Sequence, residues 1–283
     1  MMPATEQTMD PSALEDLEVR LLLQALGQVY GHDFTDYAES SLKRRLRHWL
    51  AGSSYATFSH AQAAVLRDRA VFDSLLQGIT VNFTEMFRDP PFFLALKEKV
   101  IPFLQTYPFV NIWHAGCSTG EEAYSMAILM HEAGMHGRYR LYATDINEAV
   151  LERAKAGIYP LKAMQGFTRN YQRGGGNAEF ANYYTARYDG AIFSAALREN
   201  LVFAPHNLVT DSGIGAMHMV LCRNVMIYFK PVLKERCLGL FDASLAPGGF
   251  LCLGMKERMD GRALGGAYER FAANLSIYRK RYG

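Results

Sequence analysis

Apolar residues in the first eighty positions of the chain return every three or four residues, as one face of a helix requires. The pattern predicts three helices, over residues 10–31, 35–50 and 57–77. None of these segments alternates apolar and polar residues as a half-buried strand does. We therefore predict a small all-helical domain over residues 1–80.

From residue 108 the pattern changes, and short apolar runs alternate with helical stretches. This βαβ rhythm is typical of an α/β fold with a mostly parallel sheet. We predict a linker over residues 81–107 and an α/β domain over 108–283. The predicted strands are N-I-W-H-A at 111–115, R-L-Y-A-T-D at 140–145, H-M-V-L-C-R at 218–223 and F-L-C-L-G at 250–254. The predicted helices lie near 120–134, 147–156 and 231–245, and Ala246–Gly249 is predicted to end the last of them.

The stretch from about residue 159 to residue 205 interrupts this rhythm. Asp189-Gly190 stands between two strand-like runs, and this dipeptide is a strong signal for a hairpin turn. We therefore predict a small β-subdomain at about 171–204.

Residues 110–124 read V-N-I-W-H-A-G-C-S-T-G-E-E-A-Y, an apolar run followed by a glycine-bearing turn and a helix start. Such a turn lets the backbone approach a ligand at the carboxyl end of a strand, so Gly116 belongs to a candidate cofactor site. Neither G-x-G-x-x-G nor G-x-x-x-x-G-K-[ST] occurs, which disfavours a phosphate cradle. The carboxylates of Glu121 and Glu122 favour a ligand with cationic groups and a ribose, and S-adenosylmethionine is such a ligand.

Two acidic residues near this turn each have two possible roles, and their spacing leaves both open. Asp145 follows the second strand and could accept hydrogen bonds from ribose hydroxyls, or it could be the N-cap of the helix near Asn147. Glu121 could act on a ligand, or it could form the capping box S-x-x-E with Ser118.

Composition indicates an ordinary globular protein, with 49% hydrophobic and 20% charged residues. No apolar run approaches the ~20 residues that cross a bilayer, and Met1–Asp10 lacks the features of a signal peptide. We therefore expect a cytoplasmic protein without direct membrane insertion. The cysteines form no C-x-x-C pair, so we expect reduced, mostly buried thiols and no metal site. They are Cys117, Cys222, Cys237 and Cys252.

The net charge of +2 is unevenly distributed, because no acidic residue lies between Glu39 and Asp68. This window is locally basic and attracts acidic partners, and charge alone does not separate nucleic acid, anionic lipid and an acidic protein surface. Its clustered basic residues are Lys43, Arg44, Arg45 and Arg47.

Five motifs are specific when they occur together in this order. They are I-T-V-N-F-T-E-M-F-R-D-P at 79–90, H-A-G-C-S-T-G-E-E-A-Y-S-M-A-I at 114–128, Y-A-T-D-I-N at 142–147, F-A-P-H-N-L at 203–208 and C-R-N-V-M-I-Y-F at 222–229. Together they resemble the motifs of the chemotaxis receptor methyltransferases, the CheR family, and the resemblance covers nearly the whole chain.

The resemblance implies a fold and an activity. The fold is an all-helical N-terminal domain followed by a Rossmann-like methyltransferase domain with a small β-subdomain. The activity is transfer of a methyl group from S-adenosylmethionine to glutamates of methyl-accepting chemotaxis receptors, which gives glutamyl methyl esters and S-adenosylhomocysteine. The partner is the cytoplasmic domain of such receptors and not nucleic acid, and we expect a monomer without a metal.

The resemblance also implies roles for single residues. Arg88 and Tyr228 correspond to residues beside the transferring methyl. The basic cluster of Lys43, Arg44, Arg45 and Arg47 corresponds to a receptor-docking region, although a solvated helix face is the alternative. The implied cofactor contacts are Asn82, Thr84, Arg88, Glu122, Asp145, Asn207, Leu208, Arg223 and Asn224.

Other interpretations remain open at this stage. Without the resemblance, Tyr228 reads as a core aromatic residue and Arg88 as the ion-pair partner of Asp89. The whole chain could instead be a non-catalytic S-adenosylmethionine-binding adaptor, or a methyltransferase for another acidic protein. The pattern G-H-S-E of many family members is Gly254-Met255-Lys256-Glu257 here, so no polar role of the histidine and serine carries over. In some members the β-subdomain grips a receptor's C-terminal pentapeptide, and the Asp189-Gly190 hairpin is compatible with that.

Overall fold

The computed structural model describes residues 9–81, 83–259, 266–272 and 274–282. It divides into two compact units, Met1–Val81 and Asn82–Gly283. Each unit buries its own cluster of apolar side chains. The first is helical and the second combines parallel strands with helices, so the predicted fold class is confirmed.

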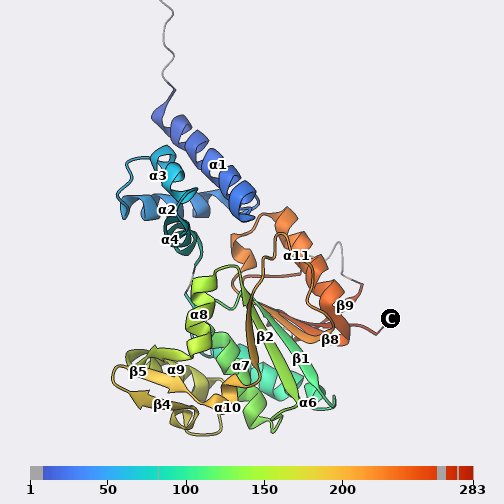
Figure 1. Ribbon diagram of the computed structural model, residues 1–283. Coiled ribbons are helices and arrows are strands. Elements are labelled where there is room, and N and C mark those ends of the chain that lie inside the picture. The colour runs from blue at the N-terminus through green and yellow to red at the C-terminus, as the bar shows by residue number, and fades with distance from the viewer. Residues whose placement is uncertain (1–8, 82, 260–265, 273, 283) are drawn as a thin grey trace, which may run out of the picture. The chain divides into compact units, whose positions relative to one another are not determined.

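Helices make up the described part of the first unit (Figure 1). They are α1 (Pro11–Tyr30), α2 (Glu39–Ala51), α3 (Phe58–Val65) and α4 (Arg69–Ile79). Their apolar faces meet in a core, as the helical spacing predicts. Buried members of this core include Leu22, Leu26, Leu46, Phe58 and Phe72.

Two predicted helices differ from the structure. The segment predicted as one helix over 57–77 is two, because Asp68 is extended and its side chain caps the helix that follows. The second predicted helix begins only at Glu39. Its first residues are held in a turn, since the Asp33 carboxylate accepts both the N–H and the hydroxyl of Thr35.

A seven-stranded sheet forms the centre of the second unit. Its strands are β1 (Val110–Ala115), β2 (Tyr139–Asp145), β6 (Leu201–Pro205), β7 (Met217–Cys222), β8 (Leu245–Leu253), β9 (Tyr268–Ala272) and β10 (Ile277–Lys280). They are ordered β6-β2-β1-β7-β8-β10-β9. The strands from β6 to β8 in this order are parallel, and β10 pairs antiparallel with β8 and β9.

Strand β8 begins earlier than predicted. Ala246–Gly249 was expected to separate the preceding helix from the strand, but it lies inside β8. The pairing of β8 with β7 shifts register between Met217 and Met219, and Gly248 has a φ of 78°. An irregularity of this kind lets a strand contain a Pro-Gly-Gly sequence.

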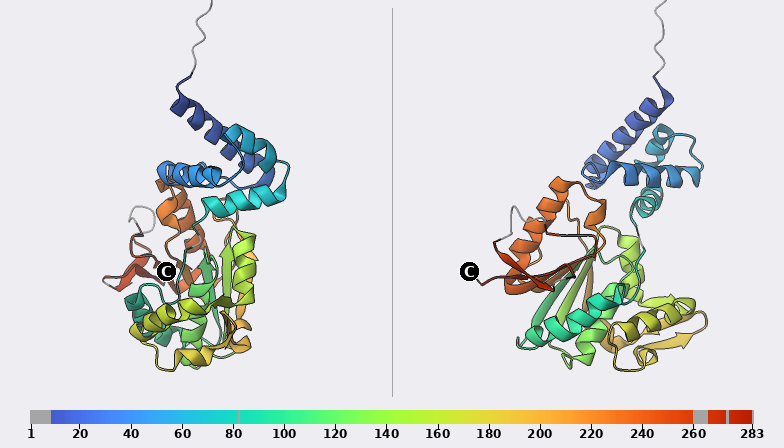
Figure 2. Two further views of the ribbon diagram at one scale, coloured as in Figure 1. Left: turned by 90° about the vertical axis from the view of Figure 1, so that its left-hand side faces the viewer. Right: turned by 180° about the vertical axis from the view of Figure 1, so that it is seen from behind.

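Helices cover both faces of the large sheet. Ile112 of β1 belongs to a core cluster with Ala127 of α7 (Glu121–Glu132). The next residue, Trp113, has its ring centroid 5.4 Å from that of Phe241 in α11 (Pro231–Ser244). Because side chains alternate along a strand, α7 and α11 lie on opposite faces, and Figure 2 shows helices on either side of the strands.

A second, three-stranded sheet is antiparallel and lies at the lower left of Figure 1. It has the order β3-β5-β4, with β3 (Ile158–Pro160), β5 (Gly190–Phe193) and β4 (Tyr184–Arg187). The hairpin predicted at Asp189-Gly190 joins β4 to β5. Strand β3 precedes residue 171, so this sheet includes an earlier segment than the one predicted for it.

The remaining helical segments are short. They are α5 (Pro90–Ala95), η1 (Leu96–Val100), α6 (Ile101–Leu104), α8 (Glu148–Ala156), η2 (Leu161–Ala163), α9 (Met164–Arg173), η3 (Phe180–Tyr183), α10 (Ala195–Arg198) and η4 (Met226–Tyr228). Three of them lie in the segment predicted as a linker. Met86, Phe93 and Leu104 of that segment are buried in the core of the second unit.

Two predictions from composition can be compared with the structure. Within the described ranges, no helix is both long and apolar enough to span a bilayer. All four cysteines are buried, as predicted, and none forms a disulfide within the described residues.

Candidate functional site

The carboxyl ends of four neighbouring parallel strands carry most of the predicted cofactor-site residues. From β1 the chain moves outward to β2 and β6, and then crosses to β7 on the other side of β1. Open α/β sheets bind ligands at such a change of direction. The residues at these strand ends are Gly116 after β1, Asp145 at the end of β2, Asn207 and Leu208 after β6, and Arg223 and Asn224 after β7.

The turn after β1 brings backbone close to its neighbours. Gly116 has a φ of 77°, and a Cβ atom there would lie 2.5 Å from Val225 Cγ2. A side chain at this position would therefore be both strained and in collision. The N–H of Ser118 donates to Asp145 Oδ2 at 2.8 Å, which ties the turn to the end of β2.

The capping box, one of the two interpretations left open for this turn, is not formed. Helix α7 has Gly120 as its N-cap, without a side-chain hydrogen bond. Ser118 lies two residues earlier with a φ of 50°, which places its hydroxyl outside the cap position. Glu121 accepts a hydrogen bond from the Thr119 hydroxyl instead, at 2.6 Å.

Asp145 is not the N-cap of the next helix. That role belongs to Asn147, whose side chain accepts the N–H of Ala149 at 3.0 Å. The two carboxylate oxygens of Asp145 accept from the N–H groups of Ser118 and Asn147. Burial raises the pKa of Asp145, and these N–H donors act against the rise. A carboxylate can accept about four hydrogen bonds, so Asp145 has acceptor capacity left for ligand hydroxyls.

Arg223 is the centre of a buried chain of ion pairs. Its side chain is 1% exposed, and it pairs with Glu122 through Nη1 and with Asp89 through Nη2. Nη2 also donates to the Arg88 carbonyl oxygen at 3.2 Å. The guanidinium carbon lies 3.9 Å from the centroid of the Phe92 ring. This chain joins α7, the end of β7 and the segment that carries Arg88.

Glu122 is held in its charged form. Burial raises the pKa of its carboxyl, but Arg223 and His114 lower it by more, and Arg88 acts in the same direction. His114 was not among the predicted site residues, although its Nε2 lies 3.3 Å from Glu122 Oε1. A histidine near the end of an apolar strand is the signal that could have indicated it.

Arg88 does not form the ion pair that its sequence context suggested. Asp89 pairs with Arg223, at 2.8 Å. Of the carboxylates that the structure describes, none forms an ion pair with Arg88. Its Nη1 donates to the carbonyl oxygen of Phe83 at 3.3 Å, and its Cζ lies 5.9 Å from the centroid of the Phe83 ring. A partly exposed guanidinium is thus held beside the strand ends without an ion-pair partner among the described carboxylates.

The other predicted site residues are less closely connected. Thr84 is half-buried four residues before Arg88, and Asn82 lies outside the described residues. Asn207 accepts the N–H of Val209 through its side chain at 2.9 Å, and Leu208 is buried. Tyr228 is half-buried in η4, on the segment that follows Asn224.

Several buried polar atoms around the strand ends have no hydrogen-bond partner in the described part of the chain. Buried polar groups are normally paired, so such a cluster indicates that a polar ligand belongs there. With the glycine turn and Asp145, this donor and acceptor set fits S-adenosylmethionine. In the same part of the chain no group of three or more His, Cys, Asp or Glu side chains is placed to hold a metal ion. The atoms are His114 Nδ1, Ser118 Oγ, Glu122 Oε1, Arg223 Nε and Asn224 Oδ1.

The predicted docking residues lie on α2 of the helical unit, and most of them have partners there. Lys43 Nζ lies 2.7 Å from Asp16 and 2.8 Å from Glu39, and Arg47 pairs with Glu15. Arg45 donates to the carbonyl oxygens of Ser41 and Ile79. Arg44 is exposed and forms no ion pair with the described carboxylates.

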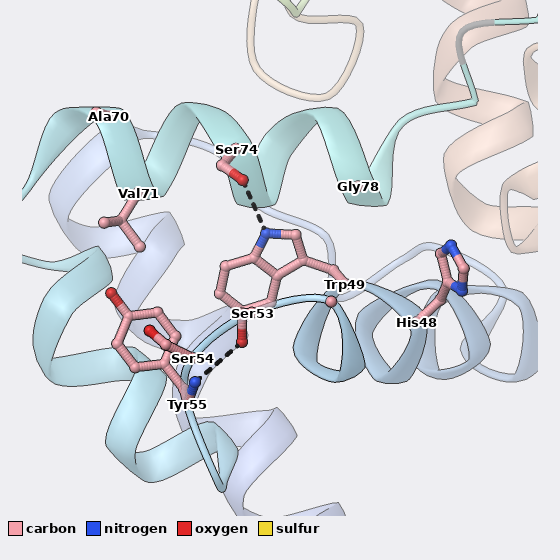
Figure 3. A pocket seen from close by; sticks show the side chains of 10 residues that line it. His48, Trp49, Ser53, Ser54, Tyr55, Ala70, Val71, Ser74 and Gly78 are labelled. Carbon is pink, nitrogen blue, oxygen red and sulfur yellow. Dashed lines mark hydrogen bonds between the residues drawn. The ribbon is translucent and has the colours of Figure 1, made fainter.

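A groove of about 520 Å³ lies between α2 and α4 of the helical unit (Figure 3). The indole of Trp49 forms one wall and donates through Nε1 to Ser74 Oγ at 3.1 Å. The residues that line the groove include no carboxylate, thiol, lysine or arginine. The groove therefore lacks the charged groups that the strand ends provide.

Glu121, just after the turn that follows β1, is expected to make the free energy of unfolding depend on pH. Burial raises the pKa of Glu121 to about 7, from its ordinary value of 4.5, while the Thr119 hydroxyl acts against the rise. Between these pH values the folded chain binds more protons than the unfolded chain, so stability falls as pH rises. Glu121→Gln should remove this loss and raise the free energy of unfolding by about 1–3 kcal/mol near pH 8, with little gain near pH 5. Urea unfolding at both pH values measures the difference, and an equal gain at both would contradict it.

Comparison with known proteins places both units in one family description. Residues 17–80 match the model "CheR methyltransferase, all-alpha domain", and residues 82–266 match "CheR methyltransferase, SAM binding domain". The Cher3 protein of Pseudomonas putida is 47% identical over 265 residues, which cover 94% of this chain and 97% of that protein. The chemotaxis protein methyltransferase of Listeria innocua is 30% identical, over 81% of this chain and 85% of that protein. Chemotaxis protein methyltransferase 1 of Vibrio cholerae is 32% identical, over 76% and 78%.

Proposed function

Because this chain belongs to the CheR methyltransferase family, we propose that it methylates glutamate side chains of methyl-accepting chemotaxis receptors. It is an S-adenosylmethionine-dependent methyltransferase. The proposal adds the acceptor, a receptor glutamate, and the products, a glutamyl methyl ester and S-adenosylhomocysteine.

The observation that supports a carboxylate acceptor is that Arg88 forms no ion pair with the described carboxylates. Asp89, its neighbour in sequence, and Glu122, whose pKa Arg88 helps to lower, are both paired with Arg223. Arg88 is therefore available for a carboxylate that comes from another molecule. A guanidinium binds a carboxylate through two parallel hydrogen bonds, which also fixes the orientation of the attacking oxygen.

The reaction requires little from the protein beyond positioning. A glutamate is already ionised near neutral pH and needs no general base. When bound, S-adenosylmethionine supplies a methyl group on a sulfonium, which is already activated for transfer. Alignment in a site with little water can supply ~7 kcal/mol or more of the barrier. We assign the alignment of the acceptor to Arg88, and a wall of the methyl pocket to Tyr228.

The same proposal assigns the cofactor contacts. Gly116 and Asp145 would face the ligand from the turn after β1 and the end of β2. The contacts of Arg223 with Glu122 and Asp89 suggest a supporting role, in which Arg223 keeps these side chains in place. The full set of proposed contacts is Asn82, Thr84, Arg88, Gly116, Glu122, Asp145, Asn207, Leu208, Arg223 and Asn224.

A labelled-methyl assay tests the proposed function. Purified protein, S-adenosylmethionine labelled in its methyl group and cytoplasmic fragments of receptors from the source cell are expected to give a labelled, base-labile ester on receptor glutamates. Label that resists mild base, or that appears only on other acidic proteins, would refute the receptor-glutamate acceptor. Cofactor binding without labelled ester on any receptor would favour the adaptor interpretation.

We also propose that the basic residues of α2 dock the acidic surface of the receptor. Arg44 forms no ion pair with the carboxylates that the structure describes, so it should contribute more than Lys43 or Arg47, which would first have to give up theirs. Arg44→Glu is expected to raise KM for a receptor fragment about fivefold at low salt and to leave kcat unchanged. Steady-state kinetics at two salt concentrations measure this effect, because screening should reduce it. Arg67→Glu is the control, since it makes the same charge change at another exposed position of the helical unit.

A further inference from the structure

A buried carboxylate outside the predicted site holds the segment that follows β7. Glu257 is 5% exposed and lies just after β8. Its Oε2 accepts the N–H groups of Asn224 and Gly254, both at 2.7 Å. Its Oε1 accepts those of Val225 and Ile227, at 3.0 and 3.1 Å. One side chain therefore binds three backbone donors of the 224–227 segment.

The backbone at Asn224 is in the left-handed region. Asn224 has a φ of 62°, which asparagine adopts more readily than most residues with a side chain, and the carboxylate of Glu257 binds the N–H groups on either side of this turn. Hydrogen bonds to a charged acceptor are about twice as strong as those between neutral groups. Burial raises the pKa of Glu257, and the N–H groups of Asn224 and Gly254 oppose the rise by favouring the carboxylate.

The contact is also packed so closely that the neighbouring residue must be glycine. A Cβ atom on Gly254 would lie 2.4 Å from Glu257 Oε2 and 2.8 Å from the nitrogen of Asn224. The other end of the turn is fixed as well, because Ser276 Oγ donates to the Glu257 carbonyl oxygen at 2.6 Å. Ser276 thus anchors the backbone of Glu257, while the carboxylate of Glu257 binds the N–H groups of the 224–227 segment.

We propose that Glu257 is a positioning residue, whose carboxylate fixes the backbone of residues 224–227 and thereby places Asn224 and Tyr228 for cofactor binding and methyl transfer. The inference rests on the proposed cofactor contacts. Glu257 itself touches neither the cofactor nor the acceptor. It acts through Asn224, the first residue of this segment, and Tyr228, the residue that follows it.

Glu257→Gln is the direct test, because it keeps the shape and replaces one acceptor oxygen with an amide that faces two N–H donors. Affinity for S-adenosylhomocysteine, measured by calorimetry on the full chain, is expected to fall about tenfold or more. Glu269→Gln, at an exposed glutamate of β9, makes the same chemical change and should leave the affinity unchanged. Unchanged affinity in Glu257→Gln would overturn the proposal.

A double-mutant cycle separates positioning from general damage to the fold. If Glu257 acts through Asn224, then Glu257→Gln should weaken binding less than about threefold in an Asn224→Ala background. The same tenfold loss in both backgrounds would show a merely structural role. Should Glu257→Gln fail to fold, Gly254→Ala displaces the same contact with the carboxylate retained, and normal affinity in that variant would refute the proposal. No receptor is present in these measurements, so failure of receptor methylation would leave their outcome untouched.

Discussion

Glu122→Ala is expected to lower the free energy of unfolding by about 3–5 kcal/mol. The change leaves the Arg223 guanidinium, which is 1% exposed, with Asp89 as its remaining ion-pair partner. Removing one member of a buried pair is costly because the other charge stays out of water. The variant should also bind S-adenosylhomocysteine more weakly, since Glu122 is a proposed cofactor contact. Urea unfolding and calorimetry measure the two effects.

An exposed ion pair in the same unit provides the matched control. Glu152 lies 2.7 Å from Lys155, and their side chains are 70% and 46% exposed. Glu152→Ala should change the free energy of unfolding by less than about 1 kcal/mol, because solvent already screens this pair. Removal of both Glu122 and Arg223 should cost less than the sum of the single changes. If the losses of unfolding free energy in the two single variants add up to the loss in the double variant, the ion pair between Glu122 and Arg223 does not account for the destabilisation.

The positions of the strand ends could be predicted because they depend on local pattern. Short apolar runs, each followed by a turn and a helix start, identify where parallel strands end, and chain order suggests which ends meet. Gly116 and Asp145 were found in this way, and the structure joins their turns through the hydrogen bond from Ser118 to Asp145. The assignment of Gly116 to the cofactor site came from the turn itself, whereas that of Asp145 came from its place after the second strand and from the resemblance. Both assignments are proposals.

Ion-pair partners could not be predicted, because they depend on segments that are distant in sequence. Asp89 is adjacent to Arg88, which made an ion pair between them plausible, yet it pairs with Arg223 at a separation of 134 residues. The capping box could not be excluded from the sequence because it, too, depends on backbone geometry. The spacing of Ser118 and Glu121 matches the motif, but Ser118 has a positive φ, which the spacing does not reveal.

The structure explains why this chain can differ from the family pattern G-H-S-E at its two middle positions. Met255 and Lys256 are exposed, whereas Gly254 and Glu257 form the close contact with Asn224. The two positions that differ from the family pattern therefore face solvent, and the two that agree with it hold the segment after β7. A sequence alone gives no sign that the glutamate accepts backbone N–H groups from residues about 30 positions earlier.

Arg88→Ala is expected to lower kcat for receptor methylation about 100-fold or more. The guanidinium is the group proposed to orient the incoming carboxylate, and alanine leaves neither its charge nor its paired donors. Affinity for S-adenosylhomocysteine should fall by a much smaller factor, because the glycine turn and Asp145 are unchanged. Arg88→Lys should recover only part of the rate, since an ammonium keeps the charge but lacks the planar pair of donors. Label incorporation under saturating cofactor gives kcat and KM separately.

Arg140 provides the control for this prediction. It is exposed near the start of β2, at the edge of the sheet opposite to the strand ends that carry the site. Arg140→Ala removes the same charge from the same unit and should leave kcat within about twofold of the unaltered protein. If Arg88→Ala retained full kcat while it bound the cofactor normally, the acceptor carboxylate would have to be oriented by another group. In that case the lack of an ion pair between Arg88 and the described carboxylates would no longer support a carboxylate acceptor. The choice between receptor glutamates and other substrates would then rest on the labelled-methyl assay alone.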